Sequence, residues 1–192
     1  MAGERSPASL HDVELAALAA AGDRPAFGEL VRRHGSAVRG LLRRMGAEPS
    51  LADDLAQDAF LVAFERVAEF RGEGAFSAWV RKIAARLYVR RWRKEAKFDP
   101  ETEAADEGHG GEGFAAARID LDEALKTLSA AERMCVSLCY GAGVSHAEAA
   151  EALNVPLGTV KSHVKRGLDK LRLRLAPGEG AQGEPVGSRG HG

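Results

Sequence analysis

Residues 158–172 read GTVKSHVKRGLDKLR, and this stretch indicates the kind of fold to expect. Its apolar residues recur at the spacing of a helix face: Val160, Val164, Leu168 and Leu171. The preceding residues, SHAEAAEALNVP (145–156), read as a short amphipathic helix followed by a turn. A helix, a tight turn and a longer basic helix are typical of a helix-turn-helix, whose second helix enters the DNA major groove. The stretch therefore predicts nucleic acid as a partner.

The helix expected over residues 157–175 carries six Lys or Arg and a single acid, Asp169. Lys and Arg can read guanine edges or neutralise phosphates, and Ser and Thr suit both tasks. Ser145 is expected to cap the first helix of the pair. A solvated charged helix is the alternative, but it would need neither the preceding helix nor the turn. The candidate DNA-binding residues are Ser145, Thr159, Lys161, Ser162, Lys165 and Arg166.

The composition favours helices and places its charge unevenly. The 192 residues are 45% hydrophobic and rich in Ala, Leu, Arg and Glu, with a net charge of −1. Residues 71–97 hold nine Lys or Arg against two acids, whereas residues 99–113 hold six acids and no Lys or Arg. This asymmetry predicts a basic binding surface beside an acidic linker.

We expect an all-α protein of two small helical domains. The predicted segments are a disordered leader (1–9), a first helical domain (10–95), a flexible acidic linker (96–116), a second helical domain (117–175) and a disordered tail (176–192). Asp23 and Pro25 suit the start of a long helix. No signal peptide and no apolar run of membrane-spanning length stands out, so a cytoplasmic protein without membrane insertion is expected.

The remaining reactive groups point to no cofactor or metal. Cys135 and Cys139 lie one helical turn apart and read as small core hydrophobes, with a redox or metal role left open.

In the basic stretch of residues 71–97, aromatic residues alternate with cations, which suits unstacked bases held along a phosphate backbone. Arg86 and Arg90 form a cationic face there. Trp79 and Phe76 could instead belong to the core.

The helix LADDLAQDAFLVAF (51–64) has an acidic face. That face could simply be solvated, or it could dock a basic partner protein with Phe60 or Leu61 as an apolar anchor. Acid-base catalysis is the enzymatic alternative, and it is disfavoured because no His, Cys or glycine-rich loop joins the carboxylates. We therefore expect a protein that is not an enzyme.

Together these segments resemble a known family. Residues 51–84, LADDLAQDAFLVAFERVAEFRGEGAFSAWVRKIA, look like region 2 of the sigma-70 family, and residues 121–172 look like region 4. Two regions joined only by a linker resemble the extracytoplasmic-function sigma factors. The resemblance implies that the chain binds core RNA polymerase, by its β′ clamp helices and β flap, and promoter DNA. It also implies an anti-sigma factor that binds between the two domains.

The resemblance assigns roles to particular residues. The β′ clamp helices would dock on Asp53, Asp54, Gln57, Asp58 and Phe60. The −10 element would be read and melted, with a flipped base held in a loop pocket, by Arg71, Phe76, Ser77, Trp79, Lys82, Arg86 and Arg90. The −35 element would be read by the second helix of the helix-turn-helix. A stand-alone helix-turn-helix regulator and a pure interaction module are the competing interpretations.

Four positions depart from the residues common in the family. Many relatives carry Asn in place of Arg86 and Asp in place of Arg90, so the −10 preference cannot be transferred. His163 replaces a common Arg and is expected to pack against the upstream helix. Gly167 replaces a common Ala and should cost about 1 kcal/mol of helix propensity.

Overall fold

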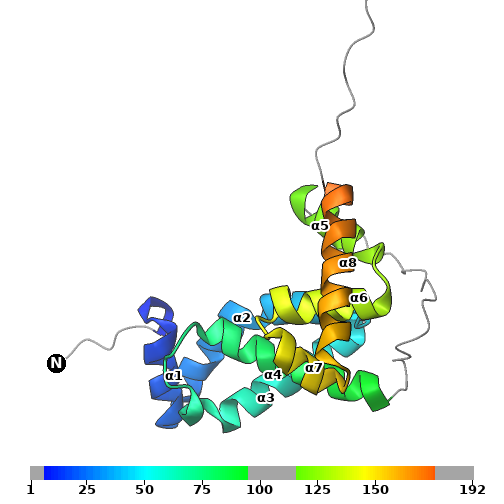
Figure 1. Ribbon diagram of the computed structural model, residues 1–192. Coiled ribbons are helices and arrows are strands. Elements are labelled where there is room, and N and C mark those ends of the chain that lie inside the picture. The colour runs from blue at the N-terminus through cyan, green and yellow to red at the C-terminus, as the bar shows by residue number, and fades with distance from the viewer. Residues whose placement is uncertain (1–6, 95–115, 176–192) are drawn as a thin grey trace, which may run out of the picture.

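The computed structural model describes residues 7–94 and 116–175, with side chains from residue 121 in the second range, and these residues contain eight α-helices and no strand (Figure 1). The all-α prediction is confirmed. The helices are α1 Asp12–Ala20, α2 Arg24–Met45, α3 Pro49–Glu65, α4 Phe76–Lys94, α5 Ala116–Lys126, α6 Ala130–Val136, α7 His146–Leu153 and α8 Leu157–Leu175. Two short 3-10 helices, η1 Pro7–Ser9 before α1 and η2 Val67–Glu69 after α3, and a short π-helical segment, η3 Ser137–Gly141 after α6, complete the described elements. The predicted linker, up to residue 115, and the predicted tail lie outside the described residues.

Local capping explains where the helices begin and end. The Asp23 side chain accepts a bond of 3.0 Å from the Ala26 N–H, and Pro25 follows in the first turn, as the sequence predicts. Helix α2 ends at Gly46, whose φ of 108° is the left-handed conformation that glycine adopts most easily. Ser129 and Ser145 each form a reciprocal capping box, at the starts of α6 and α7.

The first region packs α1, α2, α3 and α4 around buried apolar side chains. Leu15, Leu30, Leu42 and Val80, one from α1, two from α2 and one from α4, are almost completely buried there. The predicted leader is ordered where it meets this region, because the Arg33 guanidinium donates to the carbonyls of Ala8 and Leu10 at 2.9 and 2.8 Å. Those bonds fix the chain just before α1.

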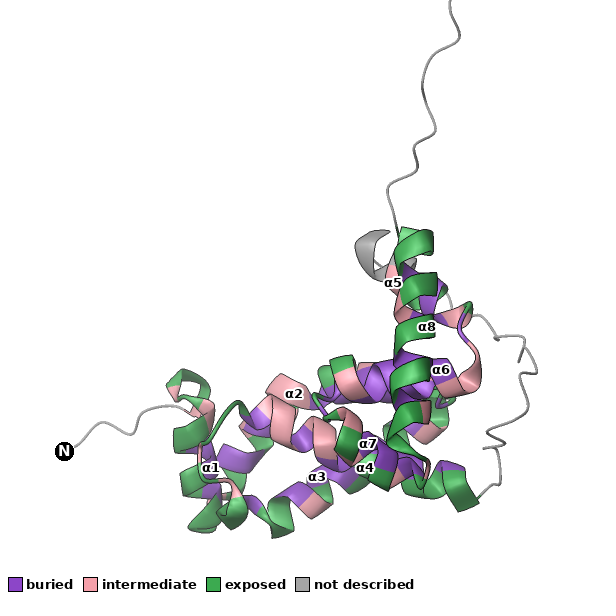
Figure 2. Cartoon of the chain, in the orientation of Figure 1, coloured by how far each residue is buried: buried purple, intermediate pink, exposed green. Residues whose placement is uncertain are grey.

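The second region packs α5, α6 and α7 against α8, and exposed residues run along the outward side of α8 (Figure 2). Gly167 lies at the contact between α8 and α6. A Cβ at Gly167 would lie 2.8 Å from the Val136 Cγ2 atom and 3.6 Å from both Glu132 Cβ and Leu128 Cδ1. The missing side chain therefore lets the two helices approach, which the helix propensity alone does not reveal.

We expect Gly167→Ala to destabilise the protein although alanine is the better helix former. Overpacking against the buried Val136 should cost about 1–3 kcal/mol, against a propensity gain of about 1 kcal/mol. Gly40→Ala in α2 is the matched control, since nothing lies within 4 Å of its Cβ position, and it should stabilise the protein. Urea unfolding followed by circular dichroism measures both. An equal gain from both variants would show that α8 and α6 are not closely packed at Gly167.

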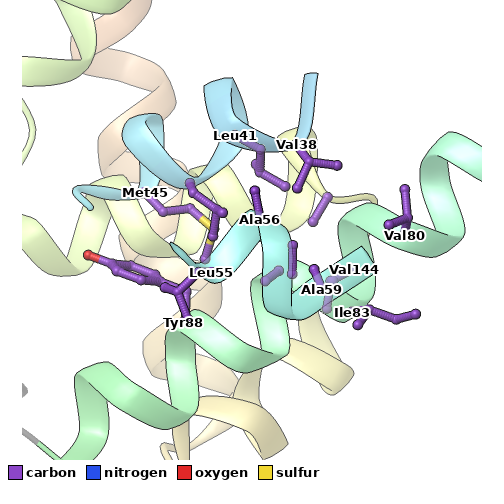
Figure 3. Packing of buried hydrophobic residues seen from close by; sticks show 14 of the residues in the cluster. Val38, Leu41, Met45, Leu55, Ala56, Ala59, Val80, Ile83, Tyr88 and Val144 are labelled. Atoms are coloured by element: carbon purple, nitrogen blue, oxygen red, sulfur yellow. The ribbon is translucent and has the colours of Figure 1, made fainter. Parts of the chain in front are cut away.

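The two regions are packed against each other. One continuous cluster of buried apolar residues runs from α1 to α8. Figure 3 shows Val144, from the loop before α7, beside Ile83 and Ala59 of the first region. A Cβ at Gly141 would lie 2.6 Å from the Leu41 Cδ1 atom, so the backbone of the second region lies directly on α2. The two predicted domains therefore pack directly against each other, and we call this the closed arrangement.

Polar bonds also cross this contact. Arg81 of α4 donates to the Gly141 carbonyl at 3.1 Å, and Arg93 donates to the Ala152 carbonyl at 3.2 Å. The Ser137 hydroxyl donates to the Arg44 carbonyl at 3.3 Å. All three bonds join a side chain to a backbone carbonyl, so they orient the second region as well as hold it.

Candidate nucleic-acid interface

Helices α7 and α8 form the helix-turn-helix that the sequence predicts. The Ser145 hydroxyl accepts from the Glu148 N–H at 3.2 Å, and the Glu148 carboxylate accepts from the Ser145 N–H at 2.9 Å. These bonds lower the pKa of Glu148. At the other end of α7, Asn154 takes the left-handed conformation at φ 58° and turns the chain into α8. This turn orients α8 so that its first residues can contact a ligand.

The start of α8 presents cations to solvent. Lys161, Ser162 and Lys165 are exposed, and Thr159 is half-buried. The Ser162 hydroxyl donates to the Gly158 carbonyl at 2.9 Å, a local bond that a DNA contact would have to share or replace. Ser145 is exposed, but its hydroxyl is part of the cap. Exposure is therefore clearest for the two lysines.

Arg166 differs from the lysines because neighbouring side chains of α8 and α6 hold its guanidinium. Its guanidinium lies 3.0 Å from His163 Nδ1 and 3.6 Å from the Glu132 carboxylate. Glu132 is buried, accepts from Lys170 at 2.8 Å and from the Ser129 N–H at 3.1 Å. Burial opposes its charge, but the bonds from Lys170 and Ser129 outweigh burial and lower the pKa of Glu132. The buried carboxylate thus anchors the basic face of α8 to α6.

The residues predicted for the −10 element fall into two groups on α4 and the loop before it. Arg71, Arg86 and Arg90 are exposed, and Lys82 is partly exposed. Phe76 is 1% exposed and faces neighbouring side chains, whereas Ser77 and Trp79 are half-buried and reach solvent in part. The sequence left core packing open for Phe76 and Trp79, and the structure places Phe76 in the core.

Glu148 of α7 lies beside the cationic face of α4. Its Oε1 atom is 3.9 Å from both the Lys82 Nζ and the Arg86 NH2 atoms. The helix-turn-helix therefore covers part of the surface that the sequence assigns to the −10 element. Both cations face an acid of the other region in this closed arrangement.

Helix α3 carries the predicted acidic face. Asp53, Asp54, Gln57 and Asp58 are exposed, whereas Phe60 is 7% exposed. The adjacent Leu61 is 63% exposed, so of the two predicted apolar anchors it is Leu61 that reaches solvent.

A groove of about 880 Å³ lies between α2 and α3, beside this acidic face. The Phe64 ring packs against Phe27 at 4.9 Å, and Arg39 reaches toward Asp53 at 3.6 Å across the groove. Sequence reasoning did not find the α2 side of the groove. The lining residues are Arg24, Phe27, Gly28, Val31, Arg39, Asp53, Ala56, Gln57, Phe60, Leu61 and Phe64. In the sequence, the signal for this groove is the apolar pair Phe60 and Leu61 beside the acidic face of residues 51–64.

The two cysteines have the surroundings of packing residues. Burial raises the pKa of Cys135 to about 12 and that of Cys139 to about 11. A thiol that stays protonated at neutral pH is a poor nucleophile and a poor metal ligand.

Residues 7–94 and 116–175 hold no helix long and apolar enough to span a membrane.

Comparison with known proteins identifies the family of this chain. Family models of Sigma-70 region 2 and Sigma-70 region 4 match residues 30–98 and 124–173. With a helix-turn-helix in the second region, they define a sigma-70-type transcription initiation protein. RNA polymerase sigma factor NccH of Alcaligenes xylosoxydans xylosoxydans is 34% identical over 175 residues, covering 85% of this chain and 94% of the relative.

Two further relatives narrow the family. ECF RNA polymerase sigma factor SigM of Mycobacterium tuberculosis is 35% identical over 167 residues, covering 86% of this chain and 83% of the relative. A solved structure of CnrH in complex with the cytosolic domain of CnrY matches with a TM-score of 0.50 at 30% identity, covering 85% of this chain and 96% of that one. The chain belongs to the ECF RNA polymerase sigma factors, which direct promoter-specific transcription initiation.

Proposed function

We propose that the chain binds core RNA polymerase through α3 and the groove beside it, reads the −10 element with the loop 71–75 and α4, and reads the −35 element with the start of α8. The observation that carries the proposal is the separation of three surfaces on one chain. One is acidic and apolar, and two are basic. A stand-alone regulator would use the basic helix-turn-helix but would leave the other two surfaces without a task.

We assign the polymerase contact to the acidic face, because DNA phosphates would repel the carboxylates of that face. Asp53, Asp54 and Asp58 would meet the β′ clamp helices electrostatically, and such complementarity supports association rate and specificity. Leu61 and Phe64 supply the apolar area on which binding energy usually concentrates. Phe60 supports this surface from below by packing at 6.5 Å on Phe27.

The two DNA elements are assigned to the two basic faces. Lys161, Lys165 and Arg166 project from the first turns of α8, where a recognition helix contacts base edges. Arg71, Arg86 and Arg90 line the −10 surface, where cations hold the phosphates of a melted strand. Because Glu148 faces Arg86 in the closed arrangement, α7 has to withdraw from α4 before both faces can bind DNA.

Regulation by an anti-sigma factor belongs to the same proposal. The solved CnrH structure contains the cytosolic domain of CnrY. A protein that bound between the regions of this chain would compete with DNA for α4. We place the second polymerase contact, to the β flap, on region 4.

Leu61→Asp tests the polymerase assignment. Removing a central apolar anchor and burying a charge should weaken binding to core RNA polymerase at least about tenfold. Leu18→Asp is the matched control, because Leu18 is an exposed apolar residue of α1 outside the groove lining, and it should bind core as the unchanged protein does. Surface plasmon resonance with immobilised core measures both affinities. Equal affinities for Leu61→Asp and the control would place the polymerase contact elsewhere.

A further inference from the structure

The loop of residues 71–75, between η2 and α4, has an unusual backbone. Gly72 and Gly74 both take positive φ, at 74° and 91°, which side chains other than glycine rarely adopt. The neighbouring Arg71, Glu73 and Ala75 are exposed. A glycine-rich exposed loop has many accessible conformations in isolation, so something else must select the one observed.

Three aromatic rings clamp the two ends of this loop. Phe70 precedes it and Phe76 follows it, and their ring centroids lie 5.4 Å apart at 87°. Trp79 lies 5.6 Å from both rings. Edge-to-face and tilted contacts at these distances are favourable, so the cluster holds the loop ends together.

His34 connects this clamp to the N-terminal helix. Its ring lies 5.6 Å from the Phe76 ring, and its Nε2 atom lies 2.7 Å from the Asp12 Oδ2 atom. The other Asp12 oxygen accepts from Arg33 at 3.0 Å. Asp12 therefore has both oxygens occupied, and it fixes the orientation of the His34 ring that packs on Phe76.

Helix α1 also touches the loop itself. A Cβ on Gly72 would lie 3.3 Å from the Val13 Cγ1 atom, which places the valine directly against the loop backbone. Val13 is 51% exposed, so it contributes little to the core. An exposed apolar side chain lying against a functional loop is better explained by support of that loop than by burial.

We propose that Asp12, Val13 and His34 are positioning residues that brace the loop 71–75 from behind and so preorganise it to capture a base of the −10 strand. The inference rests on the proposed function of this loop, and it adds α1, which lies before the residues matched as Sigma-70 region 2. Preorganising a loop removes an ordering cost from binding. The brace is expected to act on −10 capture alone, because its three residues lie on α1 and α2 and none of them lines the α2–α3 groove.

The test uses the full chain bound to core polymerase and a forked promoter DNA. Its sequence comes from start sites mapped by transcription, and 2-aminopurine replaces bases of the non-template −10 strand in turn. Val13→Ala removes the loop contact, and His34→Gln keeps a donor for Asp12 but removes the ring from Phe76. If the productive loop conformer falls to a tenth of the population, fork affinity falls about tenfold. The fluorescence increase of the unstacked base should fall with it.

Two controls separate positioning from a general loss of structure. Leu18→Ala shortens another exposed apolar residue of α1, about 140° around the helix from Val13. Arg32→Ala removes an exposed cation next to the brace that pairs with Glu29. Both should keep the fork affinity and the base signal. All four variants should keep their affinity for core and for a −35 duplex.

The outcomes are distinct. Unchanged fork affinity and base signal in folded Val13→Ala and His34→Gln would overturn the brace. A parallel loss of core affinity in these variants would also overturn it, since the role would then be general stability. If the unchanged holoenzyme gives no −10-dependent base signal, the −10 role of the loop fails and the brace fails with it.

Discussion

Reversing the charge at Lys161 and Lys165 together should lower promoter-directed transcription at least about a hundredfold. Both lysines are exposed at the start of α8. Loss of one cation that contacts a base or phosphate typically costs about 1–3 kcal/mol, and the introduced carboxylates also repel the phosphates. Because neither lysine lies in the α2–α3 groove, affinity for core polymerase should be unchanged.

The matched control reverses two arginines at the far end of the same helix. Arg172 and Arg174 are exposed in the last turn of α8, beyond the turns that would enter the DNA major groove. Run-off transcription from one mapped promoter, at a fixed salt concentration, compares the two double variants. If both lost activity equally, the effect would be one of net charge, and α8 would not be docked by its first turns.

Phe76→Ala should reduce the free energy of unfolding of the first region by about 3–5 kcal/mol. The ring is 1% exposed and contacts Phe70, Trp79 and His34. Trp79 lies 5.6 Å away, so its fluorescence is a suitable signal during urea unfolding. A loss of this size would identify Phe76 as a core residue of the first region, in agreement with its burial.

Phe64→Ala is the control for Phe76→Ala. Phe64 is 36% exposed at the edge of the groove, so the same substitution should cost clearly less. Similar small losses in both variants would contradict the burial of Phe76. They would also support a direct contact between the Phe76 ring and the −10 strand.

Much of the fold could be predicted because its signals are local. The cap at Asp23, the cap at Ser145 and the apolar spacing of α8 each depend on residues within one or two helical turns. The same holds for the exposed lysines, which lie opposite an apolar face of their own helix. Such patterns are visible in a sequence before any tertiary contact is known.

The remaining features depend on residues far apart in the chain. The groove needs Phe27 of α2 and Leu61 of α3 to be neighbours, and neither helix predicts the other's position. The role of Gly167 depends on the approach of Val136, and that of His34 depends on Phe76 and Asp12. The closure of the two regions was likewise not predicted, because a sequence read as two domains says nothing about the contact between them.

In vitro transcription tests the central claim most directly. The purified chain, core RNA polymerase free of other sigma factors and fragmented genomic DNA would be combined, and the transcript starts mapped. We predict discrete starts that share two short upstream elements and that disappear with the Lys161→Glu, Lys165→Glu variant. A chain that binds core but yields no discrete starts, or that shifts DNA only without core, would contradict the account.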